Sequence, residues 1–203
     1  LNKAKITRAG KITNAAIILL GREESEHFLS PAVCVIRWKL LAKEDKNKDF
    51  HNFHVPMIKS VEEITTGYIR NNNYVYTVSG NIFPENMMRY DVFTLREPIC
   101  NAIGHQDYGM GARIELLEYE DEKLVIQNYG QFIPNSVEDV VEKDCPDSRY
   151  RNPFLMEAMC NIGMAETEGG GIRKLFVQQR KRFFPMPIYD LSGQKVRCEI
   201  QGK

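Results

Sequence analysis

The chain has 203 residues, and its 27 Lys and Arg are balanced by 27 Asp and Glu, so the formal net charge is zero. A neutral balance argues against a broad surface for nucleic-acid phosphates, and an apolar fraction of 43% is too high for a disordered chain. No apolar run approaches the roughly 18 residues of a membrane-spanning helix, so we expect no membrane partner.

The first part of the chain predicts alternating helices and strands. A short buried helix is expected at 11–21, with Thr13 as its N-cap and Gly21 just past its end. The patterns that follow predict a strand at 32–41, a polar turn at 43–52, a strand at 55–58, an amphipathic helix at 61–71 and a strand at 74–78.

The second part predicts longer helices around a hairpin. In chain order we expect a helix at 95–107, a hairpin of strands at 113–119 and 124–128, helices at 152–162 and 171–182, and a strand at 195–200. Turn residues occur at 80–86, and a soft boundary near residues 80–84 leaves open two lobes or one continuous α/β domain. We divide the chain into an α/β lead-in region, 1–82, and a second domain, 83–203.

The cysteines indicate the compartment of the protein, and the absence of one motif excludes a class of enzyme. Five scattered cysteines without a C-x-x-C pair indicate a reducing compartment, so we expect a cytoplasmic protein. The chain has no G-x-x-x-x-G-K-[ST] sequence, which excludes a P-loop helicase motor within these residues.

The segment 95–108 carries the strongest chemical signal. On a helix, Glu97, Asn101, His105 and Tyr108 fall within an arc of roughly 80°, so one face presents hydrogen-bonding groups. The alternative is structural: Thr94 and Glu97 match a capping box, and a proline at 98 fits the first turn of a helix. In that case Asn101 and His105 are satisfied polar residues of the core.

Two further motifs follow along the chain. A strand ends in Asn128-Tyr129-Gly130, which is also a common turn sequence. Gly169, Gly170 and Gly171 then open a helix, and their amides at a helix N-terminus suit an anion such as a phosphate. A flexible entry to the helix is the alternative.

The order of these motifs resembles the GHKL ATPases, a superfamily that includes gyrase, the heat-shock chaperone ninety family, histidine kinases and MutL. More closely, L-R-E-x-x-x-N-A-x-x-H-x-D-Y, I-x-N-x-G, R-N-P-x-L and G-G-G-I-R-K resemble a GHKL-like ATP-binding domain of bacterial proteins described as transcriptional regulators or RecG-related helicases. The resemblance covers about residues 84–187. The segment 10–21 is similar to the stretch that precedes this domain, after a Schlafen/AlbA-type DNA-binding domain, so we expect the chain to begin just after such a domain.

The resemblance implies a fold and a set of roles. The fold is a GHKL (Bergerat-type) α/β sandwich, a mixed sheet with helices on one face, preceded by the smaller α/β lead-in. Glu97 would act as the catalytic base and Asn101 as the ligand of Mg²⁺. The ATP-binding residues would be Asn101, His105, Asp107, Asn128, Gly130, Gly169, Gly170 and Gly171.

Three departures from the superfamily pattern keep a second function open. Asn128 stands where most GHKL ATPases have Asp, Pro98 replaces an alanine, and Gln106 replaces the Arg of H-R-D-Y. The first hypothesis is an ATP-binding regulatory module of a bacterial transcriptional regulator, with DNA contacted through a domain outside these residues. The alternative is a degenerate GHKL-like scaffold for homo-oligomerisation or protein contacts, without nucleotide turnover.

A third hypothesis concerns nucleic acid directly. The clusters Arg173-Lys174 and Arg180-Lys181-Arg182, followed by Phe183-Phe184, form a local basic and aromatic patch. A solvated helix face is the competing interpretation of this patch.

Overall fold

A mixed six-stranded sheet forms the centre of the protein. The structure, a computed structural model, describes residues 2–42, 46–71, 73–76, 83, 85–142, 149–165 and 170–202. The strand order is β4-β3-β7-β8-β10-β9, in which β3 and β7 run parallel and every other neighbouring pair is antiparallel. The strands are β3 (Ile36–Leu41), β4 (Asn47–Phe53), β7 (Ile114–Tyr119), β8 (Lys123–Tyr129), β9 (Ile188–Asp190) and β10 (Lys195–Gln201).

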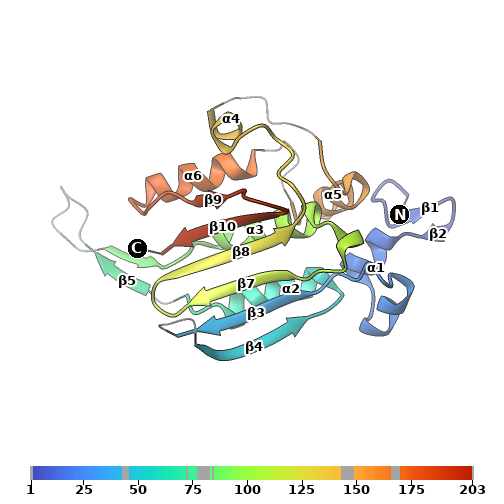
Figure 1. Cartoon of the computed structure of the whole chain (residues 1–203), viewed down its shortest axis with the longest axis horizontal. Coiled ribbons are helices and arrows are strands. Elements are labelled where there is room, and N and C mark those ends of the chain that lie inside the picture. Colours follow the sequence, from blue (N-terminus) through green and yellow to red (C-terminus); the bar gives the residue numbers. More distant parts are fainter. Residues whose placement is uncertain are drawn as a thin grey trace.

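Helices cover one face of this sheet, so the predicted mixed α/β class is confirmed. Figure 1 shows α2 and α3 behind the sheet, and α3 packs between β8 and α6. The helices and helical turns are α1 (Asn14–Leu20), η1 (Glu23–Phe28), α2 (Met57–Glu63), η3 (Ile64–Tyr68), α3 (Val92–His105), η4 (Tyr108–Met110), α4 (Val137–Glu142), α5 (Pro153–Asn161) and α6 (Gly171–Lys181). Two small antiparallel ribbons complete the fold, β1 (Thr7–Arg8) with β2 (Lys11–Ile12) and β5 (Asn73–Tyr76) with β6 (Glu85–Met88).

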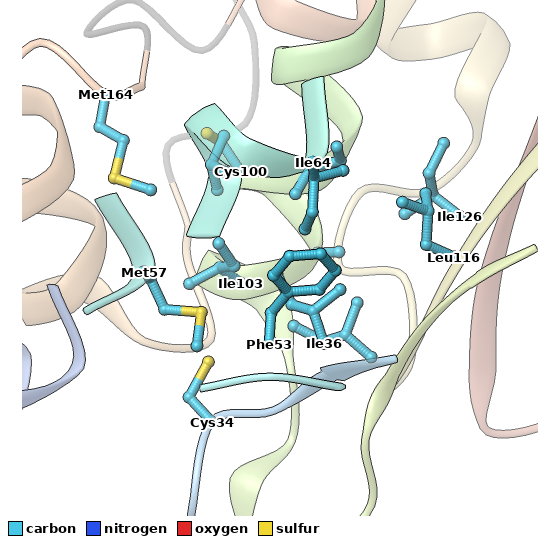
Figure 2. Close-up of a cluster of buried hydrophobic side chains, with 14 of the residues drawn as sticks. Cys34, Ile36, Phe53, Met57, Ile64, Cys100, Ile103, Leu116, Ile126 and Met164 are labelled. Atoms are coloured by element: carbon cyan, nitrogen blue, oxygen red, sulfur yellow. The ribbon is translucent and has the colours of Figure 1, made fainter. Parts of the chain in front are cut away.

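The core lies between the sheet and these helices (Figure 2). Alternate residues of the strands point toward the helices, so Ile36, Leu116 and Ile126 pack with Ile103 of α3. The opposite face carries charged pairs, such as Lys39 with Glu115 at 3.4 Å. This one-sided burial is typical of sheets with helices on a single face.

The sheet combines both sides of the predicted division of the chain. β3 and β4 come from residues below 82, whereas the other four strands come from residues beyond it. Residues 77–82, at the predicted boundary itself, lie outside the described residues. The lead-in region therefore supplies two strands to the same sheet as the second domain.

Several predicted elements are confirmed and two are wrong. Thr13 does cap α1, because its Oγ1 accepts from the amide of Ala16 at 3.1 Å. The turn predicted at 43–52 is largely a strand, β4, whose polar residues suit an exposed sheet edge. The strand predicted at 55–58 is instead the start of α2, which begins after Pro56. Helix and strand signals overlap in apolar segments this short.

Candidate functional site

The helix that carries the predicted polar face begins earlier than expected. Asp91 is the N-cap of α3, and its Oδ1 accepts from the amide of Thr94 at 2.8 Å. The proposed capping box is therefore wrong, because Thr94 and Glu97 both lie inside the helix. Pro98 also lies in the helix interior rather than in its first turn. Glu97 is thus available for a role other than capping.

A cavity brings five of the predicted residues together. Its walls include Glu97, Asn101 and His105 from α3, Asn128 from β8 and Gly171 at the start of α6. The space between these walls is about 950 Å³, part of it open to solvent. Since these residues come from three separate elements, only the packing of α3 against β8 and α6 places them in one cavity.

Glu97 is buried and held by its neighbours. It is 4% exposed, and one oxygen, Oε1, accepts from Nδ2 of Asn101 at 3.1 Å. The backbone of Gly171 presses against the same carboxylate, since a Cβ atom at this position would lie 1.5 Å from Oε1. Any larger residue at position 171 would therefore require the Glu97 side chain to move. The positive end of the helix dipole favours a negative group at this point.

His105 is a neutral imidazole at physiological pH. Burial lowers its pKa to about 4, and the nearby charge of Arg151 contributes in the same direction. Its ring lies against that of Tyr150, with 5.6 Å between the centroids. An uncharged histidine can donate one hydrogen bond and accept another, but it adds no positive charge to the cavity.

Asn128 lines the cavity from near the end of β8. It is 5% exposed and pairs in register with Val196 of β10. Its Nδ2 donates to the carbonyl of Tyr129 at 3.2 Å. This leaves the amide oxygen, Oδ1, as the acceptor that Asn128 can offer to a ligand.

Three other predicted residues, Asp107, Gly130 and Gly170, do not line this cavity. Asp107 accepts from the amide of Gly109 at 3.1 Å and lies 3.5 Å from Arg151 in an ion pair. Gly130 adopts a φ of +119°, and a Cβ there would come within 2.7 Å of the Arg151 guanidinium, so it serves close packing. Gly170 is the N-cap of α6, and Gly169 lies outside the described residues.

Gln106 proves to be a structural residue. Its side chain is 1% exposed; Nε2 donates to the carbonyl of Ala112 at 2.7 Å and Oε1 accepts from the amide of Tyr129 at 2.9 Å. It therefore joins the end of α3 to the end of β8. A longer guanidinium here would need a different arrangement of both segments.

Sequence reasoning missed the aromatic and apolar part of the cavity wall. Tyr150, Tyr189 and Phe132 line the cavity together with Cys198. Tyr189 also lies parallel to Phe176 of α6, with 6.4 Å between the ring centroids. β9 has only three residues, too few to show the alternation that identifies a strand.

The donor set suits a hard cation that also binds a ligand's phosphates. Among the described residues, no group of three or more His, Cys, Asp and Glu side chains could hold a metal ion by itself. Asn101 uses Nδ2 to bind Glu97, so its Oδ1 is the atom that can face a cation. Mg²⁺ prefers oxygen ligands and commonly takes only one or two of them from the protein.

Comparisons with known proteins agree with this architecture. The model of the family HATPase_c_4, described as "Putative ATP-dependent DNA helicase recG C-terminal", matches residues 111–200, so this part of the chain is similar to an ATPase-like domain related to RecG. The match begins after α3. The assignment of Glu97, Asn101 and His105 to the site therefore depends on the geometry described above.

A solved structure has the same fold. The crystal structure of the DIP2311 protein from Corynebacterium diphtheriae matches with a TM-score of 0.76 and 14% sequence identity. The match covers 100% of this chain and 41% of that chain, so the present chain spans less than half of its length. No curated protein matches. In the part of the chain that the structure describes, no helix has the length and apolar character needed to cross a bilayer.

Proposed function

We propose that the chain binds ATP together with Mg²⁺ in the cavity between α3, β8 and α6, and hydrolyses it slowly. The observation that carries this proposal is the convergence of Glu97, Asn101, Asn128 and Gly171 on one cavity. The ATPase-like match over residues 111–200 supports the same ligand class.

Each of these residues has a chemical role in the proposal. Asn101 holds Mg²⁺ through Oδ1, and the start of α6 at Gly170 and Gly171 receives phosphate through backbone amides. Asn128 accepts from the amino group of adenine through Oδ1. Mg²⁺, when bound, neutralises phosphate charge.

Glu97 acts on the attacking water. A carboxylate oxygen accepts a proton from that water as it approaches the terminal phosphate, and a positioned base of this kind contributes about 10²–10⁴ in rate. The apolar walls of the cavity limit the access of other water molecules. His105 and Tyr150 help to form the wall next to Asn101.

Calorimetric titration with Mg·ATP and an assay of phosphate release test the proposal. We expect Asn101→Ala to weaken binding of Mg·ATP, because it removes the oxygen ligand, and Glu97→Gln to keep binding but lose turnover by about 10²–10⁴-fold. Glu157→Gln is the matched control, since Glu157 is an exposed glutamate that pairs with Lys5 at 3.2 Å. A folded wild-type protein that gives no binding heat with millimolar ATP would contradict the proposal.

A scaffold without nucleotide is the second candidate. It is favoured by the tight contact of Gly171 with the Glu97 carboxylate, which already satisfies the start of α6 with a negative group. In a scaffold, Glu97→Ala lowers the free energy of unfolding without changing any response to ATP. In the nucleotide-binding protein, the same substitution changes turnover.

We extend the proposal to the role of the whole protein in which this module lies. We place the ATP-binding module in a bacterial transcriptional regulator, where nucleotide occupancy alters the contacts of the whole protein. The regulatory DNA would be contacted through a domain outside these residues. The related family's description names a DNA helicase, but the 203 residues contain no P-loop motor motif.

A further inference from the structure

The charge of this neutral chain is unevenly distributed. The stretch 170–189 contains five Lys and Arg residues and no Asp or Glu. Four of these cations are exposed and lie along α6 at helical spacing, with half-exposed Val177 between them: Arg173, Lys174, Arg180 and Lys181. Among the described residues, neither Arg180 nor Lys181 forms an ion pair. The outer side of α6 is therefore a cationic row that ends at its C-terminus.

A strained aromatic residue follows directly after this row. Phe183 has a φ of +57° and is 73% exposed. It occupies the position after the helix end where glycine is the usual residue, since the amides of Phe183 and Phe184 bond back to the carbonyls of Arg180 and Gln179. A side chain in the left-handed region is disfavoured, and burial does not compensate for it here. The ring is thus kept in an unfavourable backbone conformation while facing solvent.

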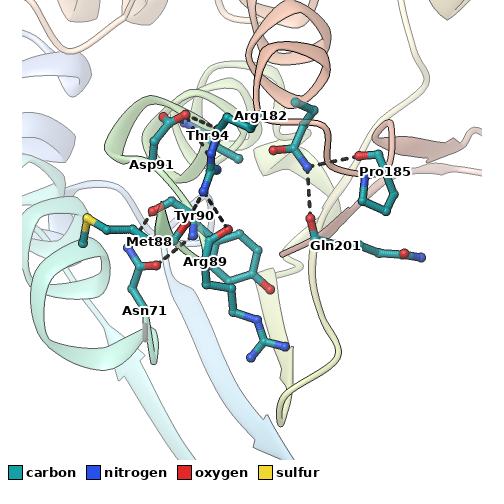
Figure 3. A network of polar contacts seen from close by, with 10 residues as sticks. Asn71, Met88, Arg89, Tyr90, Asp91, Thr94, Arg182, Pro185 and Gln201 are labelled. Atoms are coloured by element: carbon teal, nitrogen blue, oxygen red, sulfur yellow. Dashed lines mark hydrogen bonds and ion pairs between the residues drawn. The ribbon is translucent and has the colours of Figure 1, made fainter. Parts of the chain in front are cut away.

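The segment around Phe183 is firmly anchored. Arg182 is buried, lies over the ring of Phe184 at 4.3 Å and donates to the carbonyl of Met88 (Figure 3). Nε2 of Gln179 donates to the carbonyls of Pro185 and Gln201 at 3.1 and 3.0 Å. These contacts hold the backbone on both sides of Phe183, so its ring projects from a rigid support.

We propose that the outer side of α6 and the ring of Phe183 form a binding surface for single-stranded nucleic acid. Arg180 and Lys181 contact successive phosphates, and Phe183 stacks on an unpaired base. An acidic protein segment would use the cations but has no need of an exposed ring. A lipid surface could use the exposed side chains of Val177, Met186 and Ile188, but it would need a continuous apolar face, and the apolar side of α6, including Leu175, is buried against the core. The surface is separate from the nucleotide cavity and does not depend on ATP.

Fluorescence anisotropy with a labelled oligothymidylate of about 20 nucleotides, measured without ATP, tests the proposal. Two phosphate contacts, from Arg180 and Lys181, predict that log Kd rises with log salt concentration with a slope of about 1.4, at about 0.7 per contact on a single strand. The double variant Arg180→Ala/Lys181→Ala should lower this slope by about 1.4. Arg8→Ala/Lys11→Ala is the matched control, because these exposed cations lie on the β1–β2 ribbon at the opposite end of the molecule (Figure 1).

The substitution Phe183→Gly distinguishes a loss of base stacking from a loss of protein stability. Glycine accepts the left-handed conformation, so Tm should stay unchanged or rise, while loss of the stacked ring weakens oligothymidylate binding by about tenfold. Equal affinity of Phe183→Gly and the wild type would overturn the role of the ring. Absence of salt-dependent binding, or preferential binding to phosphatidylserine vesicles or polyglutamate over the oligonucleotide, would overturn the surface as a whole.

Discussion

At the scale of single residues, the site depends on contacts between groups far apart in the chain. Glu97 and Asn101 are one helical turn apart, but the Gly171 backbone that confines the carboxylate comes from another helix. Similarly, Gln106 has a polar side chain with no place in the cavity, because Ala112 and Tyr129 bind both ends of its amide. The type of each polar residue therefore indicated what chemistry it could perform. Its hydrogen-bond partners in the folded protein decided whether it lines the cavity or stabilises the fold.

The lowered pKa of His105 makes stability depend on pH. The pKa falls from an ordinary 6.5 to about 4, so between these values the unfolded chain binds a proton that the folded protein does not. The free energy of unfolding should thus decrease as pH falls from 7 to 5, with His105 contributing about 1–2 kcal/mol. Urea unfolding at pH 7 and pH 5 should show a smaller decrease in the free energy of unfolding for His105→Gln than for the wild type. His27→Gln is the control, because His27 lies on the exposed η1. An unchanged decrease in His105→Gln would contradict this assignment.

At the scale of elements, α3 has both a buried packing side and a polar cavity side. Leu95, Ile99 and Ile103 are fully buried, while Glu97 and Asn101 face the cavity. Gly104 lies where α3 meets α5, and a Cβ there would come 1.9 Å from the sulfur of Met156. A glycine that lowers helix propensity thus allows the close approach of two helices.

Gly104→Ala should destabilise the protein by about 1–3 kcal/mol, because Met156 is itself buried and would have to move. Gly67→Ala is the matched control: Gly67 is exposed, and no atom lies within 4 Å of the Cβ that alanine would add. Chemical denaturation of both variants gives the comparison. If Gly104→Ala were as stable as Gly67→Ala, the α3–α5 contact would be less tightly packed than the structure indicates.

At the scale of the whole molecule, the lead-in region and the second domain share one sheet. β3 pairs with β7 over six residues, from Ile36 with Ile114 to Leu41 with Tyr119. The buried carboxylate of Glu118 accepts from Nε1 of Trp38 and from the amide of Arg70, each at 2.9 Å. Burial raises the pKa of Glu118, so loss of these donors would leave a costly buried group.

Residues 83–203 alone should therefore fail to fold cooperatively. The fragment exposes β7 as a sheet edge and leaves Glu118 without both donors. Size-exclusion chromatography and urea unfolding should show aggregation or a broad transition, which co-expression with residues 1–82 corrects. A sharp transition of the isolated fragment, at the midpoint of the full chain, would contradict the prediction.

The sequence by itself determined the α/β class, the hairpin of β7 and β8, the helices α5 and α6 and the polar face of α3. These features depend on local periodicity and on the chemistry of residues one turn apart. Tertiary structure alone decided that polar residues 47–53 form an edge strand and that Gly171 meets Glu97. The physical reason is that edge strands and cavity walls are fixed by hydrogen bonds and packing between segments distant in the chain, which no local pattern records.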